Sequence, residues 1–180
     1  MMRKKRSIVS GFLLALAAVV QLMAADAKEE AVYVGARVCG ECHAGPGVNY
    51  QYSKWLASKH SQAYAALAQP ESERIARLSG IREDPQKAFG CLGCHSTAAH
   101  AEEWQRDETY RIEDGVQCET CHGPGSIHVE EHRRAVPHSG KRGRLEIPKK
   151  EQFCIRCHGV KGSHVAVLKT PAFDLEEAWQ

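Results

Sequence analysis

The chain is poor in the apolar residues from which a protein of its size usually builds a core. Aromatic residues make up only 7% of the 180 residues. Beyond residue 27 the apolar side chains are scattered, with few long alternating or helical runs. An ordinary domain of this length buries more Leu, Ile, Val and Phe. A core made of polypeptide alone is therefore excluded, and we expect other material to fill the interior.

The chain also lacks a strong net charge once its N-terminus is set aside. Residues 1–27 have the features of a cleaved signal peptide: a basic start at 3–6, an apolar run over 8–25, and Ala-Asp-Ala at 25–27. An uncleaved anchor is the alternative, because the run approaches membrane-spanning length. Residues 28–180 have the length of one domain and carry 20 basic against 21 acidic residues, a net charge of −1. We therefore expect a periplasmic or extracellular protein with no stable membrane span after cleavage and no nucleic-acid partner.

No cysteine is left over from a pattern that occurs four times. The eight cysteines all lie in Cys-x-x-Cys-His motifs: Cys39-Gly-Glu-Cys42-His43, Cys91-Leu-Gly-Cys94-His95, Cys118-Glu-Thr-Cys121-His122 and Cys154-Ile-Arg-Cys157-His158. Zinc sites, redox dithiols and disulfides also use Cys-x-x-Cys pairs, but none of them requires a histidine directly after the second cysteine. The motif is the attachment signature of haem c, in which two sulfurs reach the two vinyl groups at one porphyrin edge and the imidazole binds the iron. The sequence predicts four haems c, with His43, His95, His122 and His158 as proximal ligands.

Methionine is absent from residues 28–180, because the three methionines are Met1, Met2 and Met23. His/Met haems, which have raised potentials, are thereby excluded, and we expect mostly bis-histidine haems of low potential. Six further histidines are candidates for the distal positions: His60, His100, His128, His132, His138 and His164.

The surroundings of these histidines differ. His60 lies on the apolar face of an amphipathic helix expected over residues 51–67, where a core histidine without iron is the alternative. His128 and His132 are four residues apart on a short helix expected over 127–135, and they could serve two haems or bond a propionate. His100 follows His95 too closely to wrap around the same ring, so it could serve only another haem. His138 and His164 lie in loops containing glycine or proline.

From about Tyr33 to the C-terminus the chain resembles the tetrahaem cytochrome c-554 family. The resemblance rests on the four motifs, on their uneven spacing of 52, 27 and 36 residues between first cysteines, and on the segment with His60 after the first motif. It also rests on the block Cys118-Glu-Thr-Cys-His-Gly-Pro-Gly-Ser with His132 ten residues past His122.

This resemblance implies that His132 binds the first iron and His60 the fourth. It implies no distal ligand for the second haem, and a ligand from a C-terminal helix for the third. Residues 173–179 resemble the start of that helix, but the histidine expected further on is absent from the sequence. We therefore expect at least one haem to lack a distal ligand from its own chain, unless His164, His138 or His128 substitutes.

The fold class that follows is a mainly α, loop-rich, compact multihaem cytochrome whose haems form the core. Further helices are expected over 71–78, over 149–156 and after Pro171, and no sheet is expected. Basic residues cluster between the third and fourth motifs, where they would neutralise haem propionates or dock an acidic redox partner. The cluster consists of Arg133, Arg134, Lys141, Arg142, Arg144, Lys149 and Lys150.

The predicted function is electron transfer with redox partner proteins. One alternative is an enzyme that reduces a small nitrogen oxide or peroxide at an open haem, although no catalytic base is identified. Another is an electron-passing subunit of an oligomer or larger cytochrome assembly.

Overall fold

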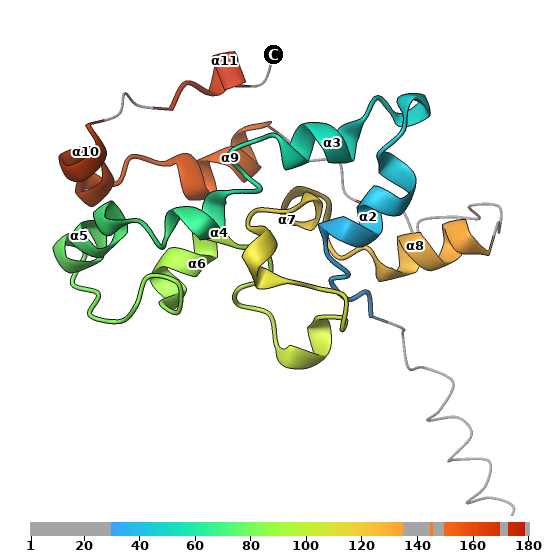
Figure 1. Ribbon diagram of the computed structural model, residues 1–180, viewed down its shortest axis with the longest axis horizontal. Helices are drawn as coiled ribbons and strands as arrows, with labels where there is room; N and C mark the ends of the chain where they lie inside the picture. Colours follow the sequence, from blue (N-terminus) through green and yellow to red (C-terminus); the bar gives the residue numbers. More distant parts are fainter. Residues whose placement is uncertain (1–29, 135–144, 146–149, 170–172, 179–180) are drawn as a thin grey trace, which may run out of the picture. The chain divides into compact units, whose positions relative to one another are not determined.

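The computed structural model describes residues 30–134, 145, 150–169 and 173–178. The chain divides into a unit over residues 1–30 and a unit over residues 31–180, and only the second is described below. Figure 1 shows short helices joined by loops. Within the described residues the β pairing is a single isolated bridge between Tyr33 and Arg106. The predicted mainly α, loop-rich fold is confirmed.

The elements, in chain order, are α2 (Ala36–His43), η1 (Pro46–Val48), α3 (Gln51–Leu56), α4 (Ala63–Ala66), α5 (Pro70–Leu78), α6 (Phe89–His95), η2 (Glu103–Gln105), η3 (Ile112–Asp114), α7 (Cys118–His122), α8 (Ser126–Arg133), α9 (Lys150–His158), α10 (Gly162–Leu168) and α11 (Leu175–Ala178). In the part of the chain that the structure describes, no helix has both the length and the apolar character that crossing a bilayer requires.

Four predicted helices occur close to their expected positions. α5 begins one residue earlier than expected, because Pro70 occupies the first helical turn, where its missing N–H costs nothing. α8 and α9 match the helices expected over 127–135 and 149–156, although residues 135 and 149 lie outside the described residues. The helix expected after Pro171 is the short α11.

The prediction of a single helix over residues 51–67 is wrong. α3 ends at Leu56 and α4 begins at Ala63. In between, Ser58 Oγ donates a hydrogen bond to the carbonyl of Trp55 at 2.7 Å, and Ser61 Oγ donates one to that of Leu56 at 3.0 Å. Serine hydroxyls that bond nearby carbonyls compete with helical hydrogen bonding. The chain therefore leaves the helix over 57–62, and His60 lies in the break.

A distant segment holds this break in place. Val116 donates its N–H to the carbonyl of His60 at 2.9 Å, and its own carbonyl accepts the indole N–H of Trp55 at 2.8 Å. Both bonds join residues far apart in the chain, so no local pattern announces them. As a result His60 is an exposed side chain beside another element and does not lie on a helical stripe.

The described residues bury few large apolar side chains. One cluster consists of Leu67, Leu92 and Ala99, with Tyr64, Cys91 and Ile112 packed against it. Other large apolar side chains remain open to solvent: Ile155 is 60% exposed and Val160 is 80% exposed. The polypeptide core is thus sparse, as the composition predicts, and filling by haem stays a prediction.

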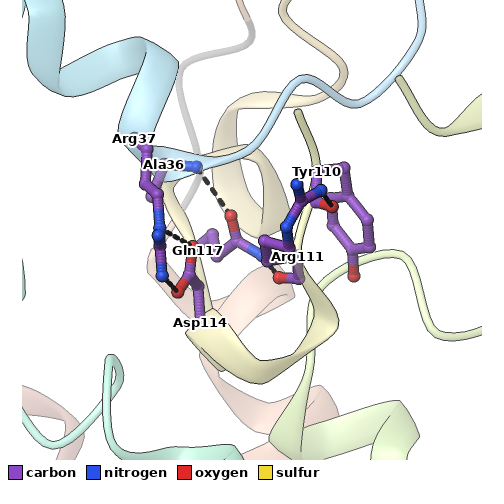
Figure 2. A network of polar contacts seen from close by, with 6 residues as sticks. All are labelled: Ala36, Arg37, Tyr110, Arg111, Asp114 and Gln117. Atoms are coloured by element: carbon purple, nitrogen blue, oxygen red, sulfur yellow. Dashed lines mark hydrogen bonds and ion pairs between the residues drawn. The ribbon is translucent and has the colours of Figure 1, made fainter. Parts of the chain in front are cut away.

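Polar contacts between distant segments also hold the fold together, and Figure 2 shows one network of them. The Gln117 side chain accepts the N–H of Ala36 at 2.6 Å and donates to the carbonyl of Arg111 at 2.8 Å. Arg37 forms an ion pair with Asp114 at 2.9 Å. These bonds attach the start of α2 to the segment that leads into α7.

Candidate haem attachment sites

Each Cys-x-x-Cys-His motif lies at the end of a helix. α2, α6, α7 and α9 end at His43, His95, His122 and His158, respectively. Helical residues at positions i, i+3 and i+4 share one face, so both thiols and the imidazole of a motif project to the same side. None of the eight cysteines, all of which the structure describes, forms a disulfide. This arrangement suits attachment of haem c through two thioethers with the histidine beneath the ring.

The motif helices contact one another in pairs. α2 contacts α7, and the thiols of Cys39 and Cys118 share a hydrogen bond. That bond, and then burial, raise the pKa of Cys39, whereas the same bond lowers the pKa of Cys118. The first and third attachment sites are therefore neighbours.

The second and fourth sites are neighbours in the same way. α6 contacts α9, and the thiols of Cys94 and Cys157 share a hydrogen bond. Burial, followed by the charge of Cys94 and this bond, raises the pKa of Cys157 to about 12. Sites that are far apart in the sequence thus lie next to each other.

A buried glutamate fastens the third motif to the N-terminal segment. Glu119, one of the two variable residues of that motif, is 3% exposed. Its carboxylate accepts the N–H groups of Val34 at 2.9 Å, Gly35 at 2.8 Å and Gly125 at 2.8 Å. Burial raises the pKa of Glu119, and the three backbone hydrogen bonds oppose this by favouring the charged form. The Cys-x-x-Cys-His pattern does not single out this residue, because it leaves the position free.

Thr97 connects the second motif with the third. This buried threonine follows the second motif by two residues, and its Oγ1 accepts the N–H of Gln117 at 2.6 Å. The hydroxyls of Thr97 and Thr120 hydrogen-bond at 2.5 Å. The backbone N–H of Thr97 donates to the carbonyl of Gly115 at 2.9 Å. The loop after α6 and the start of α7 are therefore held as one polar framework.

Three motif histidines have a second histidine nearby, with ring centres about as far apart as in two imidazoles that bind one iron. Metal–nitrogen bonds of about 2.0 Å on both sides, with about 1.1 Å from each nitrogen to its ring centre, put the two centres about 6.2 Å apart. The two ring planes can take any angle about that axis. The observed centre-to-centre distances are 6.3 Å for His43 and His128, 6.5 Å for His95 and His164, and 5.9 Å for His60 and His158. The residues present therefore fit haem iron with two axial histidines.

At the first motif, the histidine that faces His43 is on α8. The His43 Nδ1 lies 2.9 Å from the Gln51 Oε1, an acceptor that leaves Nε2 for a metal. His132 is one turn further along α8, with its ring 4.1 Å from that of His128 and its Nδ1 bonded to the carbonyl of His128 at 2.9 Å. The structure thus brings His128 to the ring of His43, and the role of His132 at the first iron stays a prediction.

At the fourth motif, the ring of Phe173 stacks on that of His158 with centres 4.0 Å apart. The ring of His60 lies 5.9 Å from that of His158, with an angle of 66° between the two ring planes. Burial, and then the charge of His60, lower the pKa of His158. The lowered pKa favours the neutral imidazole, which is the form that binds a metal.

The remaining candidates occupy other surroundings. His100 is exposed, and its ring lies 5.7 Å from that of Phe89. Its Nε2 lies 2.7 Å from the point where a Cβ on Gly93 would be, so it covers the helix of the second motif. His138 lies outside the described residues. The distal ligand of the third haem, opposite His122, stays a prediction.

The basic cluster is described only at its edge. Arg133 forms an ion pair with Glu41 at 2.6 Å, and Arg134 pairs with Glu130 one turn away. The first pair ties α8 to a variable residue of the first motif. Lys141, Arg142, Arg144 and Lys149 lie outside the described residues, so neutralisation of propionates stays a prediction.

Known proteins similar to this chain share its motif-bearing region. Residues 38–123 match a family described as cytochrome c554 and c-prime. Cytochrome c-554 of Nitrosomonas europaea is 31% identical over 171 residues, which cover 84% of this chain. The match covers 66% of that relative, so the chain spans just under two thirds of its length. No solved structure matches the chain.

Proposed function

The chain belongs to the cytochrome c-554 family, and we propose that it is a periplasmic or extracellular electron-transfer protein that holds four haems c. Membership of the family implies covalently bound c-type haem and exchange of electrons with redox partners. The observation that supports the wider proposal is the contact between motif helices, α2 with α7 and α6 with α9. Redox groups attached at neighbouring sites lie close enough for electrons to pass between them.

The chain's own residues have three tasks in this function. The cysteines of each motif tether the group covalently, so that it stays attached although little polypeptide surrounds it. The motif histidines bind iron through Nε2, and acceptors such as Gln51 Oε1 at 2.9 Å from His43 Nδ1 fix the ring and its tautomer. Glu119 and Thr97 hold three of the motifs on one framework. When bound, haem c supplies one-electron chemistry at low potential, because residues 28–180 offer no methionine ligand.

The number of haems gives the first test. The purified protein should have the mass of its polypeptide plus four haems and no reactive thiol, since all eight cysteines lie in motifs. Reductive titration should take up four electrons per chain and reverse fully on oxidation. Intact-mass spectrometry and spectroelectrochemistry make these measurements. Three or fewer haems would refute the count, and rapid turnover of peroxide or a nitrogen oxide would favour the enzyme instead.

For the distal positions we propose His60 at the fourth iron and His128 at the first. The support is the ring separations of 5.9 Å from His60 to His158 and 6.3 Å from His43 to His128. His128 takes the place that the family resemblance assigns to His132. A helix places side chains four residues apart on one face, but about 6 Å apart along its axis, so we assign only one of the two to a given iron.

Substituting each α8 histidine in turn separates the two assignments. His128→Ala should convert one haem from low spin to high spin, because the first iron loses its sixth ligand. His132→Ala serves as the matched control, since it removes the same side chain from the same helix, and it should leave the spin states unchanged. Low-temperature EPR of the oxidised proteins counts the two kinds of haem. A high-spin signal in His132→Ala alone would restore the family assignment and refute ours.

A further inference from the structure

The second motif lies beside a histidine that the family resemblance does not use. We infer that His164 binds the iron of the second haem as its distal ligand, so that this site is closed. The inference rests on the proposed function, because it needs a haem at Cys91 and Cys94. It departs from the resemblance, which gives the second haem no distal ligand.

The first support is the placement of the two rings. The ring centres of His95 and His164 lie 6.5 Å apart, with an angle of 26° between their planes. Rings in direct contact lie closer, as Phe173 and His158 do at 4.0 Å. Two imidazoles on opposite sides of one metal ion lie about 6.2 Å apart, given metal–nitrogen bonds of about 2.0 Å. The distance between the ring centres of His95 and His164 therefore matches the distance expected for two imidazoles that bind one iron.

The second support is the orientation of His95. Its Nδ1 lies 2.8 Å from the backbone carbonyl of Ala63. A carbonyl only accepts hydrogen bonds, so in the neutral ring Nδ1 carries the proton and Nε2 has the lone pair. Histidines that bind metals are typically held in this way, by a carbonyl or carboxylate on the other ring nitrogen. The half-buried ring of His95 is therefore prepared for a metal at Nε2.

The third support is the anchoring of the helix that carries His164. α10 packs against α5, and the hydroxyls of Ser79 and Ser163 hydrogen-bond across this contact at 2.9 Å. Ser163 Oγ lies 3.5 Å from the Nδ1 of His164, at the long end of hydrogen-bonding distance. The serine pair thus steadies the helix directly beside the ring, and the ring itself is half-buried.

The route of the chain explains how His164 comes to the second motif although it follows the fourth. α6 contacts α9, so the second and fourth motifs lie side by side. Three residues separate the end of α9 at His158 from the start of α10 at Gly162. Because this connection is short, α10 lies close to α9 and therefore close to the second motif.

Closure has a chemical consequence. A haem with two histidine ligands has no open position, so small ligands bind its ferrous iron only by displacing an imidazole. The second haem of this protein should therefore pass electrons without binding carbon monoxide or nitric oxide.

The holoprotein variant His164→Ala tests this inference. We expect one additional high-spin haem in the EPR spectrum and one more carbon monoxide bound per reduced chain than in the unmodified protein. Added imidazole should abolish both changes. His100→Ala is the control, because His100 also lies against the second motif but covers Gly93, and neither readout should change. If His164→Ala keeps four haems and matches the unmodified protein in both readouts, the inference is wrong.

If His164→Ala does not yield a protein with four haems, a second variant tests the inference. His164→Met should keep the second haem low-spin and introduce the methionine-to-iron charge-transfer band, which residues 28–180 cannot otherwise produce because they contain no methionine. A four-haem His164→Met protein without that band would overturn the inference. Failure of the proposed function is read separately, from a haem count below four in the unmodified protein.

Discussion

Replacing Glu119 by alanine should lower the free energy of unfolding of the holoprotein by about 3 kcal/mol, because each buried donor left without a partner costs about 1–3 kcal/mol. The three donors are the backbone N–H groups of Val34, Gly35 and Gly125. At 3% exposure the carboxylate has little contact with water, so solvent does not already share these bonds. For a chain of this length the loss corresponds to a fall in Tm of about 6–12 °C.

Thermal unfolding followed by circular dichroism measures the effect, and two variants calibrate it. Glu119→Gln keeps one acceptor oxygen but turns an NH2 group toward a backbone donor, so we expect a smaller loss than for alanine. Glu73→Ala removes an exposed glutamate that pairs with Arg77 at 3.5 Å, and exposed pairs contribute about 0–1 kcal/mol. Equal Tm values for Glu119→Ala and Glu73→Ala would show that water replaces the carboxylate, and the proposed fastening would be wrong.

The residues of the proposed attachment sites can be identified from the sequence because each motif occupies five consecutive residues. Two cysteines and a histidine at fixed spacing need no tertiary structure to be identified, and their common face follows once the motif is helical. Glu119 could not be predicted in the same way. Its position within the motif accepts many residues, and its partners Val34 and Gly35 precede it by more than eighty residues in the sequence.

The pairing of histidines could not be predicted from local pattern either. His43 and His128 are on helices that meet only after the chain has folded, and the spacing within α8 allows either His128 or His132 to face inward. The glycine before His164 predicts a loop, but in the structure Gly162 is the first residue of α10, so that prediction is wrong. In each case the missing information is which distant element lies opposite.

The segment around His60 shows how a distant contact overrides a helical pattern. The apolar spacing over residues 51–67 favours one helix, but the carbonyl of His60 accepts the N–H of Val116 at 2.9 Å, outside any helix. Gly115, the residue before Val116, has a φ of +73°, a backbone conformation that residues with a side chain rarely adopt. A Cβ at Gly115 would lie 2.6 Å from the carbonyl oxygen of His60 and 3.0 Å from that of Ser61. The backbone of the loop with His60 therefore lies so close to Gly115 that a side chain at that position would clash with it.

This contact gives two ways to disturb the fourth haem, one direct and one through the backbone. His60→Ala should turn one haem from low spin to high spin without changing the haem count, because the proposed assignment makes His60, whose ring lies 5.9 Å from that of His158, the second ligand of the fourth iron. Gly115→Ala should produce the same signal in part, since the added methyl group pushes the His60 carbonyl away, and it should also cost about 1–3 kcal/mol in backbone strain.

Gly80→Ala is the matched control for the backbone variant. Gly80 has a φ of +74°, and a Cβ there would meet nothing within 4 Å. Its replacement therefore imposes similar strain without displacing His60, so stability should fall while all spin states stay as they are. Low-temperature EPR and thermal unfolding of the four proteins separate strain from ligand loss. An unchanged EPR spectrum in His60→Ala would mean that His60 is not an iron ligand, and the 5.9 Å approach of its ring to His158 would then be packing alone.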